Sequence, residues 1–183
     1  MVERFVQNLI LGDELAFKAL VKEHQSRVYH HVMQILRNRE EAEDVCQETF
    51  IQVYESIKSF KGQSSLSTWI IRIAINKALE KLRKEKRRNQ LRELLPWWMP
   101  EESKSFDSIQ MHPGIKLEDK ETAAMLYKAI DSLNPNQRVA FTLIKLDEIS
   151  YAEASEMMDL SIKAIESLVS RAKENIKKKW QTL

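Results

Sequence analysis

A long amphipathic segment in the first half of the chain carries polar residues that suit nucleic-acid binding. Trp69, Arg72 and Asn76 are spaced three and four residues apart, so on a helix they lie on adjacent turns of one face. An indole can stack on an unpaired base, a guanidinium pairs with phosphate, and an amide can hydrogen-bond to a base edge. Residues 77–92 add eight Lys or Arg against two Glu. This pattern indicates a helix that binds a phosphate backbone and an unpaired base; the alternative is a core Trp followed by a solvated helix end.

The last part of the chain predicts a second polar face. A short helix opened by Ser150 and a final helix opened by Ser161 are separated by a tight turn at Asp159 and Leu160. The final helix has a polar outer side and a basic end at residues 177–179. Two short helices joined in this way describe a helix-turn-helix, whose second helix reads the major groove of DNA. An ordinary helical hairpin is the alternative.

Four side chains could bind a transition metal: His24, His30, His31 and Cys46. A metalloenzyme in which some of them meet between adjacent helices is therefore a second alternative. The chain has no HExxH, no CxxC, no glycine-rich phosphate loop and no nucleophile elbow. We expect no catalytic residue, no metal site and no cofactor, and hence a protein that is not an enzyme. The single cysteine excludes an internal disulfide and fits a reducing compartment.

The elements that position these residues are predicted to be helices. The 183 residues include only 3 Gly and 4 Pro, with 43% hydrophobic and 31% charged residues, which favours an all-α fold. Apolar periodicity predicts helices over residues 1–11, 13–37, 38–57 and, after a loop at residues 60–67, from about 68, and again from about 119, 135, 150 and 161. Capping boxes are predicted at Asn38–Glu41 and Ser150–Glu153, and a helix start at Asn134 with Pro135 in the first position.

The composition divides the chain into two small helical domains joined by a flexible linker. Residues 1–88 form the first domain, residues 89–118 the linker and residues 119–183 the second domain. The linker holds three of the four prolines and an apolar stretch, Leu-Leu-Pro-Trp-Trp-Met-Pro, at residues 94–100. We find neither a signal peptide nor an apolar run of the ~20 residues that cross a bilayer, so we expect a cytoplasmic protein.

Two stretches resemble conserved regions of one family, and they occur in that family's order. The first reads AEDVCQETFIQVYESIKSFKGQSSLSTWIIRIAINKALEKLRKEKR and resembles the second region of bacterial extracytoplasmic-function (ECF) sigma factors. The other reads LNPNQRVAFTLIKLDEISYAEASEMMDLSIKAIESLVSRAKENIKK and resembles their fourth region. The resemblance implies a sigma factor that binds core RNA polymerase and directs it to promoters.

The resemblance also implies roles for individual residues. Docking on the polymerase clamp would use Asp44, Gln47 and Glu48. Binding and melting of the minus-ten element would use Phe60, Lys61, Ser67, Trp69, Arg72, Asn76, Lys77, Arg83, Lys84 and Arg87. Reading of the minus-thirty-five element would use Ser161, Lys163, Glu166, Ser167, Ser170, Arg171 and Lys173.

The sequence departs from the family pattern in its second motif. Asp159 stands where the family usually has Gly in the turn, and Asp tolerates the left-handed conformation better than most residues. Ala164 and Glu166 stand where a small hydroxyl residue and a basic residue are usual. These two positions bear on which DNA sequence is preferred.

The partners implied are core RNA polymerase, promoter DNA as duplex and as melted non-template strand, and an anti-sigma factor, with no direct membrane insertion. The competing function is a helix-turn-helix regulator that acts without the polymerase. That alternative explains the second domain. It does not explain why residues 40–48 hold five acidic residues and no basic residue.

Overall fold

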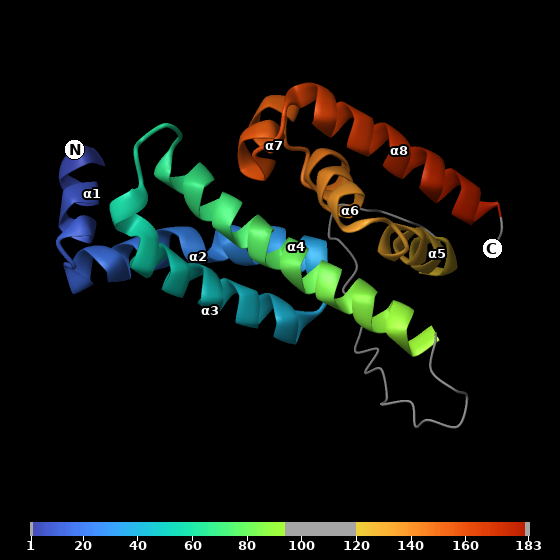
Figure 1. Cartoon of the computed structure of the whole chain (residues 1–183), viewed down its shortest axis with the longest axis horizontal. Coiled ribbons are helices and arrows are strands. Elements are labelled where there is room, and N and C mark those ends of the chain that lie inside the picture. The colour runs from blue at the N-terminus through green and yellow to red at the C-terminus, as the bar shows by residue number, and fades with distance from the viewer. Residues whose placement is uncertain (1, 94–119, 182–183) are drawn as a thin grey trace.

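The computed structural model describes residues 2–93 and 120–181, and within these ranges every regular element is a helix, as predicted (Figure 1). The first half contains α1 (Val2–Ile10), α2 (Glu14–Leu36), α3 (Arg39–Ser56), the 3-10 turn η1 (Ile57–Ser59) and α4 (Leu66–Glu93). The second half contains α5 (Lys120–Asp131), α6 (Pro135–Phe141), the π-helical turn η2 (Thr142–Leu146), α7 (Tyr151–Met158) and α8 (Ile162–Trp180).

Most predicted helix ends have the expected chemistry. The Asn38 side chain accepts a hydrogen bond from the Glu41 backbone N–H at 3.1 Å, which is one of the two bonds of the predicted capping box. Ser150 and Glu153 form both bonds of the predicted capping box. Asp159 ends α7 in the left-handed conformation, with φ of 55°, and the Ser161 hydroxyl accepts from the Ala164 N–H at the start of α8. The two helices of the predicted helix-turn-helix are therefore defined by their own local sequence.

One predicted cap is wrong. Pro135 occupies the first turn of α6 as expected, but the Asn134 side chain makes no capping hydrogen bond. Its Oδ1 accepts instead from the Lys86 ammonium group of α4. The side chain is thus used for a contact between the two halves, because a charged donor competes successfully with a backbone N–H.

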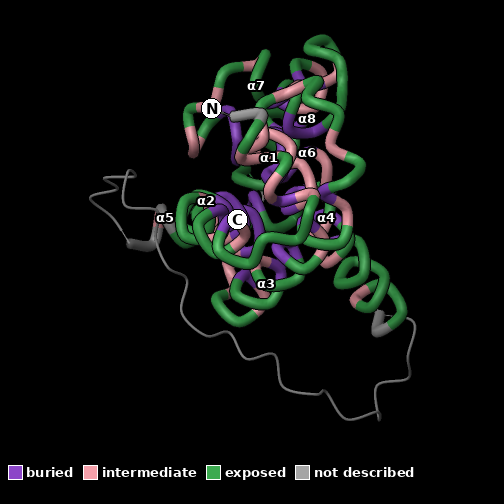
Figure 2. Tube along the Cα trace, turned by 90° about the vertical axis from the view of Figure 1, so that its left-hand side faces the viewer, coloured by how far each residue is buried: buried purple, intermediate pink, exposed green. Residues whose placement is uncertain are grey.

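The hydrophobic core is shared between the two halves of the chain (Figure 2). Helices α2, α3 and α4 pack against one another, and α4 also packs against α6 and α7. Buried residues of α4, among them Ile70, Ile71 and Ile75, belong to the same cluster as Val139 and Met157 of the second half. A smaller cluster joins α5 to α8. The sequence contains no local signal for this packing between halves.

The apolar stripes of α3 and α8 predict that Cys46, Leu168 and Ile176 lie in the core, but all three are only partly buried. Helix α4 continues to Glu93, five residues past the predicted boundary at Arg88. The apolar stretch at residues 94–100 lies outside the described residues. In the described ranges, no helix is long and apolar enough to span a membrane.

Candidate nucleic-acid interface

The polar stripe of α4 begins with a tryptophan that is partly built into the core. Trp69 is half-buried, and its ring lies 5.4 Å from the ring of Phe60 at a tilt of 53°. Both rings pack against the shared core. Because one part of the indole remains accessible, Trp69 can support the preceding loop and still offer an edge to a base. The position of Trp69 is therefore compatible with both predictions from the sequence, a stacking surface for an unpaired base and a residue of the core.

The loop before α4 is held by serine hydroxyls. Ser65 accepts a hydrogen bond from the Thr68 N–H at 3.0 Å and so caps α4. Gly62 has φ of 69°, a conformation that favours glycine, and the neighbouring Lys61 is exposed. Ser67 accepts from Arg27 of α2 at 3.2 Å. Sequence reasoning missed Arg27, whose exposed guanidinium lies beside the predicted melting residues.

The next two turns differ in their accessibility. Arg72 donates from Nε to the carbonyl oxygen of Glu156 at 2.9 Å, and its Nη1 lies 3.4 Å from Asp159 Oδ1. Asn76 is exposed. Of the predicted base-contacting residues, Asn76 is therefore accessible to a ligand in this structure. The guanidinium of Arg72, in contrast, is already bonded to α7 and to the turn after it.

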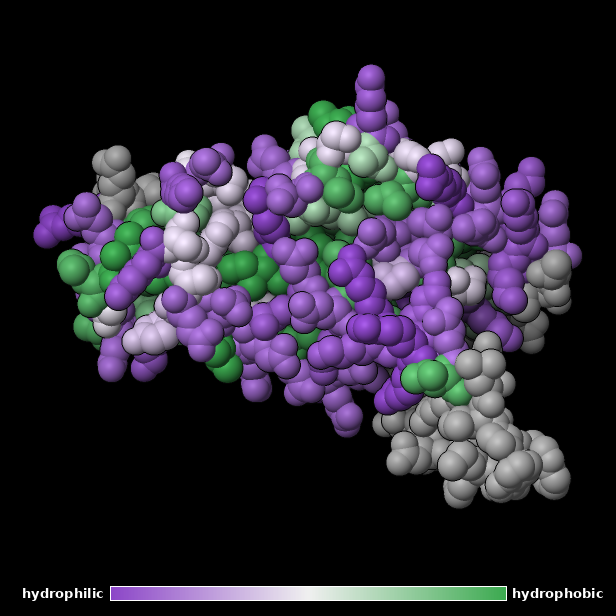
Figure 3. Space-filling model, in the orientation of Figure 1, coloured by the Kyte–Doolittle hydropathy of each residue, from purple (hydrophilic) through white to green (hydrophobic). Residues whose placement is uncertain are grey.

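The basic end of α4 faces several directions. Lys77 and Lys81 turn toward α3, where Nζ of Lys77 lies 3.6 Å from Glu48 and Nζ of Lys81 lies 3.5 Å from Asp44. Arg83 donates to Asn136 of α6 at 3.2 Å. Lys84 and Arg87 are exposed, and the surface over this end of α4 is mostly hydrophilic (Figure 3). Basic groups along one helix provide the electrostatic attraction that a phosphate backbone requires.

The predicted polymerase-docking residues lie together on the outer face of α3. Asp44, Gln47 and Glu48 are all exposed. The same face continues one and two turns later with Ile51 and Tyr54, whose exposed fractions are 59% and 52%. Sequence reasoning missed these two residues, although large apolar side chains on a polar face were visible in the helical spacing. Acidic groups beside exposed apolar groups are suited to a protein partner.

The outer face of α8 is open along its length. Lys163, Glu166, Ser170, Arg171 and Lys173 are exposed, and Ser167 is half-buried. Ser161 is exposed but uses its hydroxyl as the cap of α8. Within the described part of the chain, no ion pair joins Glu166 to Lys163. The structure thus brings the predicted DNA-reading residues onto one continuous surface.

The four candidate metal ligands, His24, His30, His31 and Cys46, do not come together as a metal site in the described part of the chain. The described residues contain no group of three His, Cys, Asp or Glu side chains placed to hold a metal ion. His31 is buried, and its Nδ1 lies 2.6 Å from Asp147 Oδ2. Burial lowers the pKa of His24 and raises the pKa of the Cys46 thiol. Burial therefore disfavours the charged form of each group, including the thiolate that binds metals.

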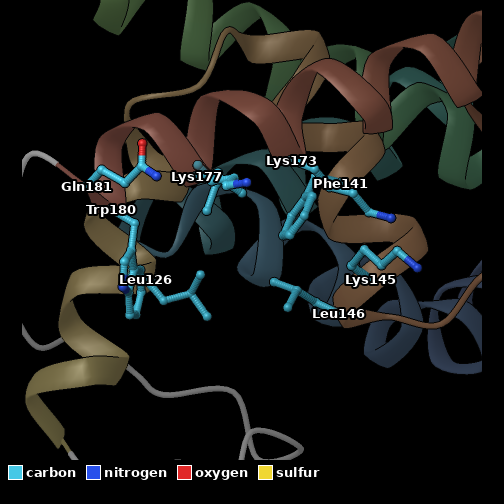
Figure 4. Close-up of a pocket in the computed structure, with 9 residues that line it drawn as sticks. Leu126, Phe141, Lys145, Leu146, Lys173, Lys177, Trp180 and Gln181 are labelled. Carbon is cyan, nitrogen blue, oxygen red and sulfur yellow. The ribbon is translucent and has the colours of Figure 1, made fainter.

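An apolar groove lies between α5, the α6–η2 segment and α8, and one of the predicted DNA-reading residues, Lys173, is among its lining residues (Figure 4). It encloses about 650 Å³. Its lining residues are Leu126, Phe141, Lys145, Leu146, Lys173, Ile176, Lys177, Trp180 and Gln181. Sequence reasoning missed this groove because its walls come from helices that are distant in the sequence.

Comparison with known proteins assigns both halves of the chain to one family. Residues 20–88 match the family described as sigma-70 region 2, and residues 123–176 match the family described as sigma-70, region 4. An ECF RNA polymerase sigma-E factor of Haemophilus influenzae is 32% identical over 189 residues, spanning 100% of this chain and 95% of the relative. An RNA polymerase sigma-H factor of Pseudomonas aeruginosa is 28% identical over 186 residues, spanning 99% and 94%.

Two solved structures share the fold. A structure of CnrH in complex with the cytosolic domain of CnrY has a TM-score of 0.59 and 19% identity, covering 96% of this chain and 94% of that one. The sigma factor RpoE in complex with the anti-sigma factor NepR, from Bartonella quintana, has a TM-score of 0.58 and 23% identity, covering 90% and 96%. At these identities the likeness concerns the fold alone.

The two matched regions define the class as sigma-70-type transcription factors. The order of the two regions and the full-length similarity to sigma-E proteins identify the subfamily within this class. The chain belongs to the ECF subfamily of RNA polymerase sigma factors. Sigma factors of this kind give RNA polymerase its promoter recognition and are not enzymes, which confirms the function and the absence of catalysis predicted from the sequence.

Proposed function

We propose that this sigma factor recognises a promoter through two separate faces. The outer face of α8 reads the minus-thirty-five element in the major groove, and the polar stripe of α4 binds and melts the minus-ten element. The observation that carries the proposal is that five of the residues predicted for the first task, Lys163, Glu166, Ser170, Arg171 and Lys173, are exposed on a single helix, α8. A helix with an exposed polar face and basic residues fits the major groove.

The second face is suited to an unpaired strand. Trp69 offers an indole edge, Asn76 is exposed, and Lys84 and Arg87 follow along the same helix. Unpairing a base costs a few kcal/mol, and an aromatic surface with nearby cations offsets that cost. The domain division at residues 1–88, 89–118 and 119–183 assigns one promoter element to each side of the linker.

Core RNA polymerase would dock on α3 through Asp44, Gln47 and Glu48, with Ile51 and Tyr54 adding apolar contact. The protein would act in the cytoplasm, where the polymerase is. An anti-sigma factor is a further expected partner, since the related folds named above are both complexes, one of them with the anti-sigma factor NepR.

Run-off transcription with purified core polymerase on genomic DNA fragments tests this function. We expect discrete transcripts that require the chain, and alignment of their start sites should give two conserved elements. A chain that binds duplex DNA without forming a complex with core polymerase would instead be a regulator of the competing kind, and the proposal would fail.

A further inference from the structure

The turn between α7 and α8 presents two apolar side chains next to the helix that we assign to the minus-thirty-five element. Leu160 and Ile162 have exposed fractions of 36% and 46%. They lie on either side of Ser161, the cap of α8, and Ile162 is the first residue of that helix. In Figure 1 this turn lies at the upper edge of the molecule. Exposed apolar residues are common on protein surfaces, so exposure by itself assigns no role.

Hydrogen bonds fix the backbone on both sides of Ile162. The Leu160 N–H donates to the carbonyl oxygen of Ser155 at 3.1 Å, and the Ser155 hydroxyl donates to the carbonyl oxygen of Leu160 at 2.6 Å. After the turn, the Ala164 N–H donates to the Ser161 hydroxyl at 3.2 Å. Ile162 is therefore presented from a backbone that its neighbours hold in one conformation.

Ile162 is the more accessible of the two isoleucines in the first turn of α8. Ile165 is fully buried in the shared core, whereas Ile162 is exposed. A β-branched side chain has one strongly preferred rotamer in a helix, so Ile162 loses little conformational entropy when it contacts a ligand. The first turn of α8 thus carries a preorganised apolar contact on a helix whose outer face is otherwise polar.

The hydroxyl groups around this turn are already used within the protein. Ser161 caps α8, and the Ser155 hydroxyl is bonded to Leu160. Ile162 and Lys163 are the exposed side chains that follow the cap. The N-terminal residues of a recognition helix contact base edges, and an apolar side chain in the major groove meets the C5-methyl group of thymine. An isoleucine at this position therefore suits a thymine.

Ile162 lies one helical turn before Glu166, on the same side of α8. Four residues of helix advance ~6 Å, and neighbouring base pairs are about 3.4 Å apart. The Glu166 carboxylate can accept a hydrogen bond from cytosine N4. Two side chains with this spacing can contact base pairs that lie close together in one site.

We propose that Ile162 is a specificity-determining residue of the minus-thirty-five interface, and that it contacts the C5-methyl group of one thymine in the major groove. The inference deepens the proposed function of α8 and rests on it. Removing one methyl group from water contributes about fourfold in affinity. The contact adds specificity because the other three bases present no methyl group at this edge.

The test removes the methyl group from the DNA and the apolar side chain from the protein. The probe is the duplex recovered by binding-site selection with the full wild-type chain. Each of its thymines is replaced in turn by deoxyuridine, which lacks the C5-methyl group and keeps the O4 acceptor. Ile162→Ala should keep the fold, because the side chain is exposed and alanine favours a helix, and circular dichroism checks this. Leu15→Ala, exposed in the first turn of α2, is the control.

We expect one thymine at which deoxyuridine weakens binding by the wild-type chain about fourfold. Ile162→Ala should bind the unmodified duplex more weakly by a similar factor. Replacing that thymine should then cause no further loss in this variant, because the methyl group has already lost its partner. Leu15→Ala should match the wild type on both duplexes.

Indifference of the wild-type chain to every thymine methyl group would overturn the proposal, whether or not the variant folds. An equal deoxyuridine effect in the wild type and in Ile162→Ala would also overturn it. Both results leave the proposed function intact, since the selection has then recovered a preferred sequence. A selection in which the wild-type chain enriches no sequence would instead reject the DNA-reading role of α8, and the inference with it.

Discussion

Lys77 Nζ lies 3.6 Å from Glu48 Oε2, so a residue assigned to the promoter is paired with a residue assigned to the polymerase. One turn further along α4, Nζ of Lys81 lies 3.5 Å from the other docking carboxylate, that of Asp44. Ion pairs whose carboxylate is exposed and whose lysine is partly exposed contribute at most ~1 kcal/mol, so either partner can exchange at little cost. A polymerase that engages the two carboxylates would release both lysines toward DNA.

The first prediction concerns the acidic face of α3. Asp44→Arg and Glu48→Arg, alone and together, should weaken binding to core polymerase, because like charges facing a basic partner cost several kcal/mol. Circular dichroism should show unchanged helix content, since both side chains are exposed. Glu23→Arg, exposed on α2, is the single-charge control. Equal retention of all variants on immobilised core polymerase would remove this docking assignment.

The second prediction concerns strand opening. Arg72→Ala and Asn76→Ala should spare closed-complex formation with polymerase and slow promoter melting, read as permanganate reactivity of unpaired thymines. The Asn76 variant is the cleaner of the two, because Arg72 also contacts α7 and the turn after it. Glu80→Ala, one turn further along α4 and exposed, should open the promoter at the normal rate. Normal melting by the Asn76 variant would mean that this residue does not touch the extruded base.

The third prediction concerns Glu166. A carboxylate near a phosphate is repelled, but in the major groove it accepts a hydrogen bond from cytosine N4. Glu166→Ala should therefore relax preference at one base pair by ~1–3 kcal/mol. Glu174→Ala, on the same helix and also exposed, should leave the preference at every base position unchanged. Binding-site selection measures both, and identical sequence logos for wild type and the Glu166 variant would make Glu166 a helix-stabilising residue only.

The fourth prediction concerns Glu41 and pH. Burial, followed by the nearby Glu85 carboxylate, raises the pKa of Glu41 above its ordinary value. A carboxyl with a raised folded-state pKa favours folding at low pH and loses that contribution as pH rises through the folded-state pKa. Glu41→Gln should therefore raise Tm at pH 7, and the difference should disappear below about pH 4, where the carboxyl is protonated in both states.

The control for Glu41 is Glu40→Gln, in the same first turn of α3 but exposed. It loses the same favourable interaction with the helix N-terminus without relieving a buried charge, so its Tm at pH 7 should stay equal or fall slightly. Equal Tm changes for both variants would show that burial of Glu41 carries no cost.

Much of this molecule was predictable because its local signals agree. Apolar periodicity gave the helices, and the Ser150–Glu153 box, the left-handed Asp159 and the Ser161 cap defined the helix-turn-helix without reference to the rest of the chain. The outer face of α8 followed, since residues three and four apart must share a side of a helix. The order of the two conserved regions then indicated the family.

The tertiary structure alone decided which polar residues are free. Arg72 and Asn76 lie on the same predicted polar stripe. In the structure, Arg72 is bonded to α7 and to the turn after it, whereas Asn76 is exposed. Asn134 looks like a helix cap and instead binds Lys86, 48 residues away. Helical spacing fixes the face on which a side chain lies, but it carries no information about which distant helix meets that face. That choice follows from the packing of the shared core, which brings the second half onto α4.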